Sequence, residues 1–161
     1  MKRKSSLRFR IKPYIQPFER TIALSELTTL SKSSSLTEGV HGTYSVDTSV
    51  PVEELLRRLS YWEAETSHGE RFTRQVLLES TVNTVRSGIS PTELTSLLPF
   101  SGQPPIGNRR CLRYGTHGLH EYRGKYFPQL VSGLLNIADI PEKGLVADPM
   151  SGSGTTSVEA I

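Results

Sequence analysis

One segment near the end of the chain combines an acid, two glycines and two threonines in an order that suits ligand binding. It follows the apolar residues 145–147 and has the sequence Asp148-Pro149-Met150-Ser151-Gly152-Ser153-Gly154-Thr155-Thr156. Asp148 can accept hydrogen bonds from an amine or a hydroxyl. Gly152 and Gly154 permit unusual backbone angles and leave room for a ligand against the main chain. The segment therefore predicts a turn that holds a ligand, with the free N–H groups of a following helix facing the same space.

This turn must lie between a strand and a helix if it is to hold a ligand in that way. Residues 145–148 predict a short strand buried in a parallel sheet, and a helix is expected from Thr155 onward. A further helix is expected from Tyr126 to Ile137, where apolar residues fall on one face. In open parallel sheets, ligands bind outside the carboxyl ends of the strands, where Asp148 would lie. The order helix, strand, glycine turn and helix predicts the opening of an α/β sheet.

Two common nucleotide ligands fit this glycine turn poorly. A nucleoside triphosphate site would need a lysine after the second glycine, and none follows Gly154. A dinucleotide site would need a third glycine at the family spacing, but Thr155, Thr156 and Ser157 occupy the positions that follow. The residues after the second glycine therefore favour neither a nucleoside triphosphate nor a dinucleotide.

The string from Asp148 to Thr156 resembles the cofactor motif of S-adenosylmethionine-dependent methyltransferases, in the form Asp-Pro-Phe-x-Gly-Ser-Gly-Thr-Thr. That form is typical of DNA methylases that act on exocyclic amino groups, at cytosine N4 or adenine N6, as in restriction–modification. Met150 stands where the family has phenylalanine. The resemblance implies a Rossmann-like methyltransferase fold. It also implies that S-adenosylmethionine is bound by Asp148, Pro149, Gly152, Ser153, Gly154 and Thr155.

A second segment, residues 117–130, resembles the part of the same family that lies just ahead of the glycine motif. It contains a His-x-Tyr-x-x-Lys-like string followed by an aromatic residue and a proline. In relatives this segment closes over the methionine end of the cofactor. The resemblance therefore implies four further cofactor-pocket residues, Tyr122, Lys125, Phe127 and Pro128. It covers about residues 114–161, less than a third of the chain.

The sequence lacks the family's catalytic motif. Methylation of an exocyclic amine requires a flipped base to be held against the sulfonium, and relatives hold it with Asp, Asn or Ser followed by Pro-Pro and an aromatic residue. The nearest string, residues 103–106, is Gln-Pro-Pro-Ile, whose first and last residues do not fit. No catalytic residue is therefore assigned, and the chain alone is expected to be inactive.

Three hypotheses follow from the missing motif. The chain is one half of a split DNA methyltransferase whose partner chain carries the catalytic half, or it is a truncated product of a longer gene. In the third, it is a non-catalytic DNA-binding or regulatory module. A fragment of an RNA methyltransferase is a further alternative, since some of those enzymes share an Asp-Pro-x-x-Gly-Ser-Gly string.

The cluster of positive charge near the amino terminus favours a nucleic-acid partner that binds there. Residues 1–20 hold seven Lys and Arg against one Glu, whereas the whole chain has a net charge of +3. Such a basic arm suits DNA or RNA because Lys and Arg displace condensed counterions. The alternative is a solvated tail.

Composition excludes several other classes of protein. A single cysteine, Cys111, rules out an internal disulfide and a Cys-based zinc cluster, and favours a reducing cytoplasm. His117 and His120 have no further ligand cluster, so hydrogen bonding is expected of them instead of metal binding. No run of about 18 apolar residues is present, so no transmembrane helix is expected.

The rest of the chain is expected to be mainly helical, ahead of the α/β segment. Helices are predicted over residues 51–64, 70–86 and 90–98, with Trp62 in the core. We therefore divide the chain into a basic arm (1–24), a Ser/Thr-rich linker (25–50), a helical region of unknown role (51–110) and an incomplete S-adenosylmethionine-binding domain (111–161).

Overall fold

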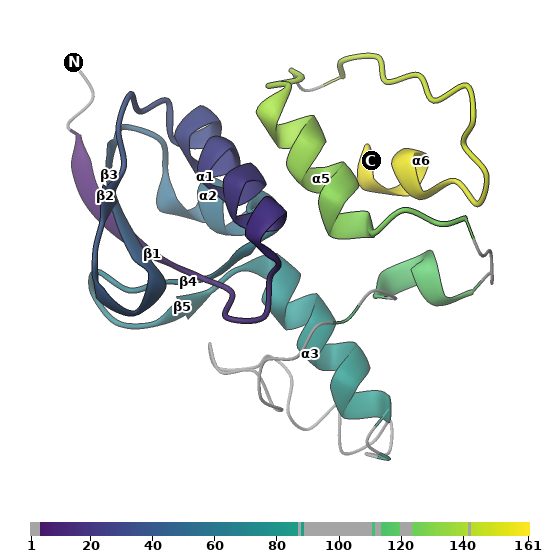
Figure 1. Ribbon diagram of the computed structural model, residues 1–161, viewed down its shortest axis with the longest axis horizontal. Helices are drawn as coiled ribbons and strands as arrows, with labels where there is room; N and C mark the ends of the chain where they lie inside the picture. The colour runs from purple at the N-terminus through teal and green to yellow at the C-terminus, as the bar shows by residue number, and fades with distance from the viewer. Residues whose placement is uncertain (1–3, 87, 89–110, 112–113, 120–123, 142) are drawn as a thin grey trace.

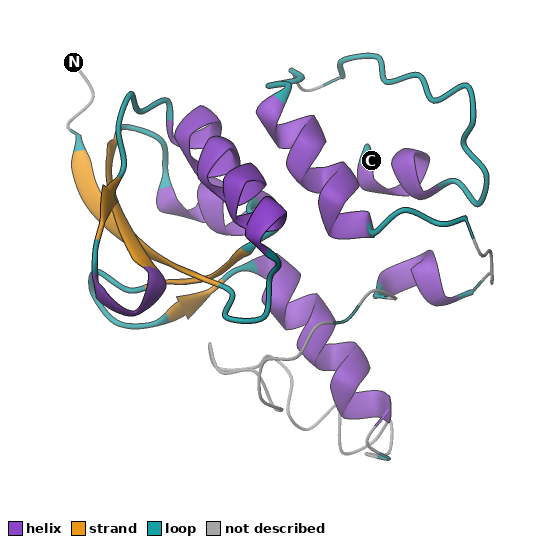
Figure 2. Cartoon of the chain, viewed as in Figure 1, coloured by secondary structure: helices purple, strands orange, loops and turns teal. Residues whose placement is uncertain are grey.

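Five antiparallel strands form one sheet in the order β2-β3-β1-β4-β5 (Figures 1 and 2). The computed structural model describes residues 4–86, 88, 111, 114–119, 124–141 and 143–161. The strands are β1 (Ser5–Ile11), β2 (Thr37–Glu38), β3 (Thr43–Thr48), β4 (Trp62–Glu65) and β5 (Arg71–Phe72). The described part of the chain is thus a mixed α/β structure, in which β1 is the central strand of the sheet.

Residues of alternating polarity explain why β1 is a strand. Leu7, Phe9 and Ile11 are buried, whereas the residues between them are exposed or half-buried. This period of two places every second side chain on the same face of the sheet. In the register with β3, Leu7 lies opposite Val46 and Phe9 opposite Tyr44, so apolar side chains meet across the strands.

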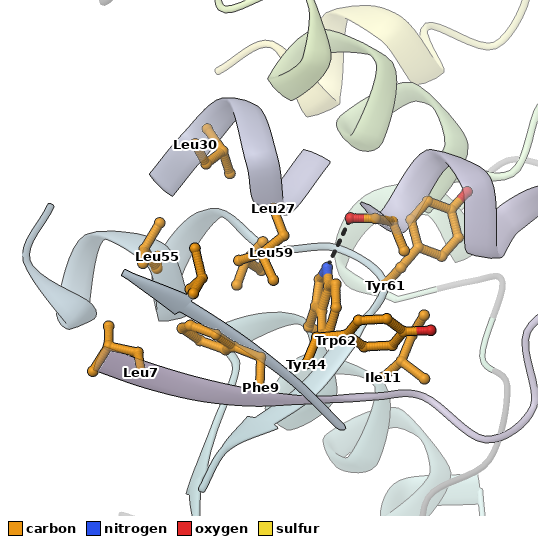
Figure 3. Close-up of a cluster of buried hydrophobic side chains, with 12 residues drawn as sticks. Leu7, Phe9, Ile11, Leu27, Leu30, Tyr44, Leu55, Leu59, Tyr61 and Trp62 are labelled. Atoms are coloured by element: carbon orange, nitrogen blue, oxygen red, sulfur yellow. Dashed lines mark hydrogen bonds between the residues drawn. The ribbon is translucent and has the colours of Figure 1, made fainter. Parts of the chain in front are cut away.

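Helices α1 (Pro17–Ser31) and α2 (Val52–Arg58) contribute to the core that covers one face of this sheet (Figures 1 and 3). The indole of Trp62 is fully buried there and donates a hydrogen bond from Nε1 to the carbonyl of Ala23, at 3.1 Å. Its ring also meets Tyr44 edge-on, with centroids 5.6 Å apart. The prediction that Trp62 belongs to the core is confirmed.

Among the described residues, the helical elements that follow the sheet are α3 (Arg74–Arg86), η2 (Gly115–Gly118), α5 (Pro128–Ile137) and α6 (Thr155–Glu159). A short 3-10 turn, η1 (Val40–Gly42), precedes β3. Helix α5 lies between α1 and α6 and contacts both (Figure 1). It therefore joins the carboxyl-terminal segment to the sheet.

A glycine allows α5 to approach α1 closely. A Cβ atom at Gly133 would lie 2.9 Å from the Tyr61 ring and 3.0 Å from the Ile22 side chain. Nearby, the Asn136 amide donates from Nδ2 to the buried carboxylate of Glu26, at 2.7 Å. The two helices are thus joined by close packing and by a buried hydrogen bond.

The expectation of a mainly helical amino-terminal region is wrong. Residues of the basic arm form β1 and the start of α1, and the range taken as a linker contains the end of α1 together with β2 and β3. Over residues 7–11, apolar side chains alternate with two arginines, so the apolar side chains share the buried face of a strand and the arginines lie on the other face.

Two predicted helices are shorter than expected. The helix predicted over 51–64 ends at Arg58, because Leu59 takes extended backbone angles and Trp62 begins β4. The helix predicted over 70–86 begins at Arg74, since Arg71–Phe72 pair with β4. The helix predicted over 90–98 lies outside the described residues.

The carboxyl-terminal predictions have a mixed outcome. The helices expected over 126–137 and from Thr155 onward are confirmed as α5 and α6. The strand predicted over 145–148 is wrong, because no described strand pairs with these residues, and Leu145 is 95% exposed. A parallel strand needs a hydrogen-bonded neighbour and cover on both faces. No helix of the described residues has the length and apolarity needed to cross a membrane.

Candidate functional site

The predicted glycine turn has the backbone conformation that its glycines favour. Gly152 has φ of 53° and Gly154 has φ of 76°, both in the left-handed region that side chains other than glycine rarely adopt. The Gly154 N–H donates to the Ser151 carbonyl at 2.8 Å, which closes the turn just before α6. A Cβ atom at Gly154 would meet nothing within 4 Å. The main chain of the turn is therefore open to a ligand at this glycine.

Asp148 accepts two hydrogen bonds that hold the residues on either side of the glycine turn together. Its Oδ1 accepts a hydrogen bond from the Met150 N–H at 3.0 Å, and its Oδ2 accepts one from the Thr156 hydroxyl at 2.6 Å. The carboxylate thus ties the residue before the turn to the first turn of α6. Asp148 is half-buried, whereas Met150 is 86% exposed. The remaining acceptor capacity of the carboxylate could serve an amine or a hydroxyl of a ligand.

The other predicted residues of the motif differ in exposure. Pro149 is exposed, Ser153 is half-buried, and Thr155 is buried as the first residue of α6. The six motif residues therefore stand together in the turn and at the start of the helix. Only the buried Thr155 is removed from a ligand that would approach from solvent.

Three of the four residues predicted from the second segment, Lys125, Phe127 and Pro128, lie just before α5 or at its start. Tyr122 lies outside the described residues. Lys125 donates from Nζ to the His117 carbonyl at 2.6 Å, which joins the chain before α5 to η2. Phe127 is 38% exposed at the residue before α5, and Pro128 is buried as the first residue of that helix. Lys125 is thus engaged in holding the local chain.

Sequence reasoning missed Glu159, which joins three segments of the carboxyl-terminal region. Its Oε1 accepts a hydrogen bond from the Tyr114 hydroxyl at 3.0 Å and lies 2.6 Å from His117 Nε2. Its Oε2 accepts a hydrogen bond from the Ser132 hydroxyl of α5 at 2.6 Å. Burial, and then the charge of Glu159, raise the pKa of Tyr114, so the phenol stays a donor.

Helical spacing could have indicated this role for Glu159. It follows the buried Thr155 by four residues, so both side chains lie on the same face of α6. That face packs toward α5, and the Glu159 side chain is 8% exposed. The hydrogen-bonding role expected of His117 is confirmed, whereas His120 lies outside the described residues.

The part of the chain that the structure describes contains no group of three or more His, Cys, Asp or Glu side chains placed to hold a metal ion. Cys111 is buried, as expected, and its carbonyl accepts a hydrogen bond from Gln129 at 2.7 Å.

A groove of about 810 Å³ lies between α2 and α3 on one side and α5 and α6 on the other. Its volume falls within the range of small-molecule sites. Nine of the ten residues predicted to bind the cofactor are described, and none of these nine lines it. Val146 and Val158, which flank the glycine turn in the sequence, do line it, as does Glu159. The turn itself therefore lies beside this groove, on more exposed surface.

Comparison with known proteins gives one partial similarity. No family model matches the chain, and no solved structure matches it. Over 50 residues the chain is 45% identical to the Type II methyltransferase M.MjaII of Methanocaldococcus jannaschii. This match covers 29% of the chain and 8% of that protein, so the chain spans a small part of the curated relative that it matches. The similarity supports a methyltransferase relationship for that part of the chain.

Proposed function

We propose that residues 111–161 bind S-adenosylmethionine as part of an enzyme that methylates an exocyclic amino group of DNA, at cytosine N4 or adenine N6. The observation that carries the proposal is the open turn between Asp148 and α6, with positive φ at both glycines. The similarity of part of the chain to a Type II methyltransferase supports the same reading.

The residues present fit a nucleoside cofactor. The missing Cβ atoms at Gly152 and Gly154 let a ligand approach the main chain there, and the hydrogen bonds that Asp148 accepts from Met150 and Thr156 hold the turn in that shape. A shape fixed before binding reduces the conformational entropy that the ligand must offset. Asp148, Gly152 and Gly154 would hold the cofactor, with Ser153 and Thr155 beside them.

The bound cofactor would supply the methyl group for direct transfer to an amine. The residues of this chain would bind and orient it, and the resulting proximity would supply much of the rate. The group that accepts from the target amine would come from further polypeptide, in the same or a second chain. The exposed apolar side chains of Leu145 and Met150 offer surface on which such polypeptide could pack.

Calorimetric titration of the full chain with S-adenosylmethionine tests the proposal with two matched glycine variants. Gly154 and Gly69 both have positive φ, and a Cβ atom at either would meet nothing within 4 Å. Valine at either position therefore imposes backbone strain without a steric clash of its Cβ atom, and Gly69 serves as the control for that strain. We expect Gly154→Val to weaken binding by about tenfold or more, a loss of about 1.4 kcal/mol, and Gly69→Val to leave it unchanged.

Gly152→Val is expected to behave as Gly154→Val, since it lies in the same turn with φ of 53°. Binding by Gly154→Val that equals that of the unmodified chain would contradict the proposed site. Absence of any binding by the unmodified chain would contradict the proposed cofactor.

A further inference from the structure

Several cations of the amino-terminal basic arm, residues 1–24, form ion pairs with acids of the same chain. Arg10 forms ion pairs with Glu63 and Glu70, and Arg20 pairs with Glu38. Lys12 is buried and its Nζ lies 2.6 Å from a Glu79 carboxylate oxygen. These side chains cannot neutralise phosphates without losing their partners, so a nucleic-acid contact must be sought elsewhere.

The groove between α2–α3 and α5–α6 presents cations that are available. Arg57, Arg74 and Lys143 line it and are exposed, and none of them forms an ion pair with another described residue. Arg58 also lines it and donates from Nε to the neutral side chain of Asn136 at 3.3 Å. The Lys32 ammonium, and then the charge of Arg58, lower the pKa of Asp139, so Arg58 shares this one acid of the groove with Lys32. Four cations thus converge on one concave surface.

The acids of the same groove are mostly engaged. Asp139 forms an ion pair with Lys32, and Glu159 is held by Tyr114, His117 and Ser132. Among the described lining residues, Glu54 and Glu159 are the acids without a Lys or Arg partner in an ion pair. The cations therefore dominate the charge that the groove offers to a ligand.

We propose that this groove binds the sugar–phosphate backbone of a nucleic-acid strand. Arginine presents several N–H donors in a planar fork that matches phosphate oxygens, and each neutralised phosphate releases condensed counterions. Val146 and Val158 line the groove and flank the glycine turn in the sequence, so a strand held there passes beside the turn. The inference rests on the proposed function, because it names the surface that holds the substrate of that function.

Fluorescence anisotropy of the full chain with short labelled DNA tests this proposal. The groove variant is Arg57→Ala/Arg74→Ala/Lys143→Ala, and the control is Lys4→Ala/Arg8→Ala, which removes exposed cations at β1. We expect the groove variant to bind about tenfold or more weakly. The negative slope of log affinity against log salt should become less steep by about 2.7, which is about 0.9 for each of the three cations removed. The control should change affinity less than about twofold.

Two additional substitutions sharpen the test. Arg57→Lys/Arg74→Lys keeps the charges and should retain most of the salt dependence, whereas Glu54→Gln should tighten binding. Unchanged affinity and slope in the groove variant, or loss of binding in the control alone, would overturn the proposal. So would an acidic polypeptide, poly-glutamate, that binds as tightly as DNA.

Calorimetry with S-adenosylmethionine on the same groove variant separates this proposal from the proposed function. Retained cofactor binding together with lost DNA binding supports both. Retained cofactor binding together with unchanged DNA binding overturns the groove proposal and leaves the cofactor site standing. Parallel assays with single-stranded DNA, duplex DNA and RNA of one sequence identify which nucleic acid the groove prefers.

Discussion

The amino-terminal sheet and the carboxyl-terminal segment, residues 124–161, differ in how far their large apolar side chains are exposed to solvent. Phe9 and Trp62 are completely buried under the helices that cover the sheet, whereas Leu145 and Met150 are 95% and 86% exposed. Strand β1 has a hydrogen-bonded neighbour on each side, and no described strand pairs with residues 145–148. An apolar run therefore becomes a strand only where the fold supplies neighbours and cover.

Polar contacts and one close approach attach the second region to the first. Helix α5 packs on α1 at Gly133, and Asn136 donates to the buried Glu26. Glu159 joins α6 to α5 within the segment, and also to η2, which precedes it in the chain. The sheet thus depends on an apolar core, whereas the segment that carries the candidate site depends on a few specific contacts.

The largest expected effect contrasts a buried and an exposed apolar residue. Trp62→Ala should lower the free energy of unfolding by about 3–5 kcal/mol, because it removes a filled part of the core and a hydrogen bond to Ala23. Leu145→Ala should change it by less than about 0.5 kcal/mol. Urea denaturation followed by circular dichroism measures both, and similar losses in the two variants would break the comparison.

A smaller effect is expected at the contact between the two regions. Alanine usually stabilises a helix by about 0.5–1 kcal/mol relative to glycine. At Gly133 the added methyl would collide with Tyr61 and Ile22, so Gly133→Ala should instead destabilise the protein by about 1–3 kcal/mol. A stabilised variant in thermal denaturation would show that α5 does not pack on α1 in this way.

The smallest effect concerns pH. Burial raises the pKa of Glu26 above its ordinary value, although hydrogen bonds from Asn136 and Ser60 oppose the shift. The folded state therefore holds the proton more tightly, and the contribution of Glu26 to stability is lost as pH rises above the unfolded pKa. The unfolding free energy of the unmodified chain, minus that of Glu26→Gln, should fall with rising pH by up to about 1.4 kcal/mol per unit. A difference that rises with pH would contradict the raised pKa.

The sequence predicted the local elements best where one period was uninterrupted. Helix α5 and the burial of Trp62 followed from helical spacing and from apolar character. The sheet is not predicted from the sequence for two reasons. The arginines of β1 indicate a basic arm when only their charge is considered. The apolar residues of β4 follow those of α2 closely, so they extend the helical pattern past the true end of the helix. Long-range pairing such as that of Phe9 with Tyr44 leaves no local signal.

The backbone conformation of the glycine turn could be predicted from the sequence, whereas the side-chain contacts around it could not. Glycines at 152 and 154 indicated positive φ, and both residues adopt it. The contacts of Glu159 and the burial of Lys12 against Glu79 depend on elements far apart in the sequence, so residue types alone could not indicate them. For the same reason, the paired state of the cations in the basic arm could not be foreseen.

The most direct test of the cofactor site is a titration of the ¹⁵N-labelled full chain with S-adenosylmethionine, followed by amide chemical shifts. We expect saturable shifts at Gly152, Gly154 and Thr155, with little change at residues of β1. Shifts confined to other parts of the chain, or no shifts at these three amides, would contradict the claim that this turn binds the cofactor.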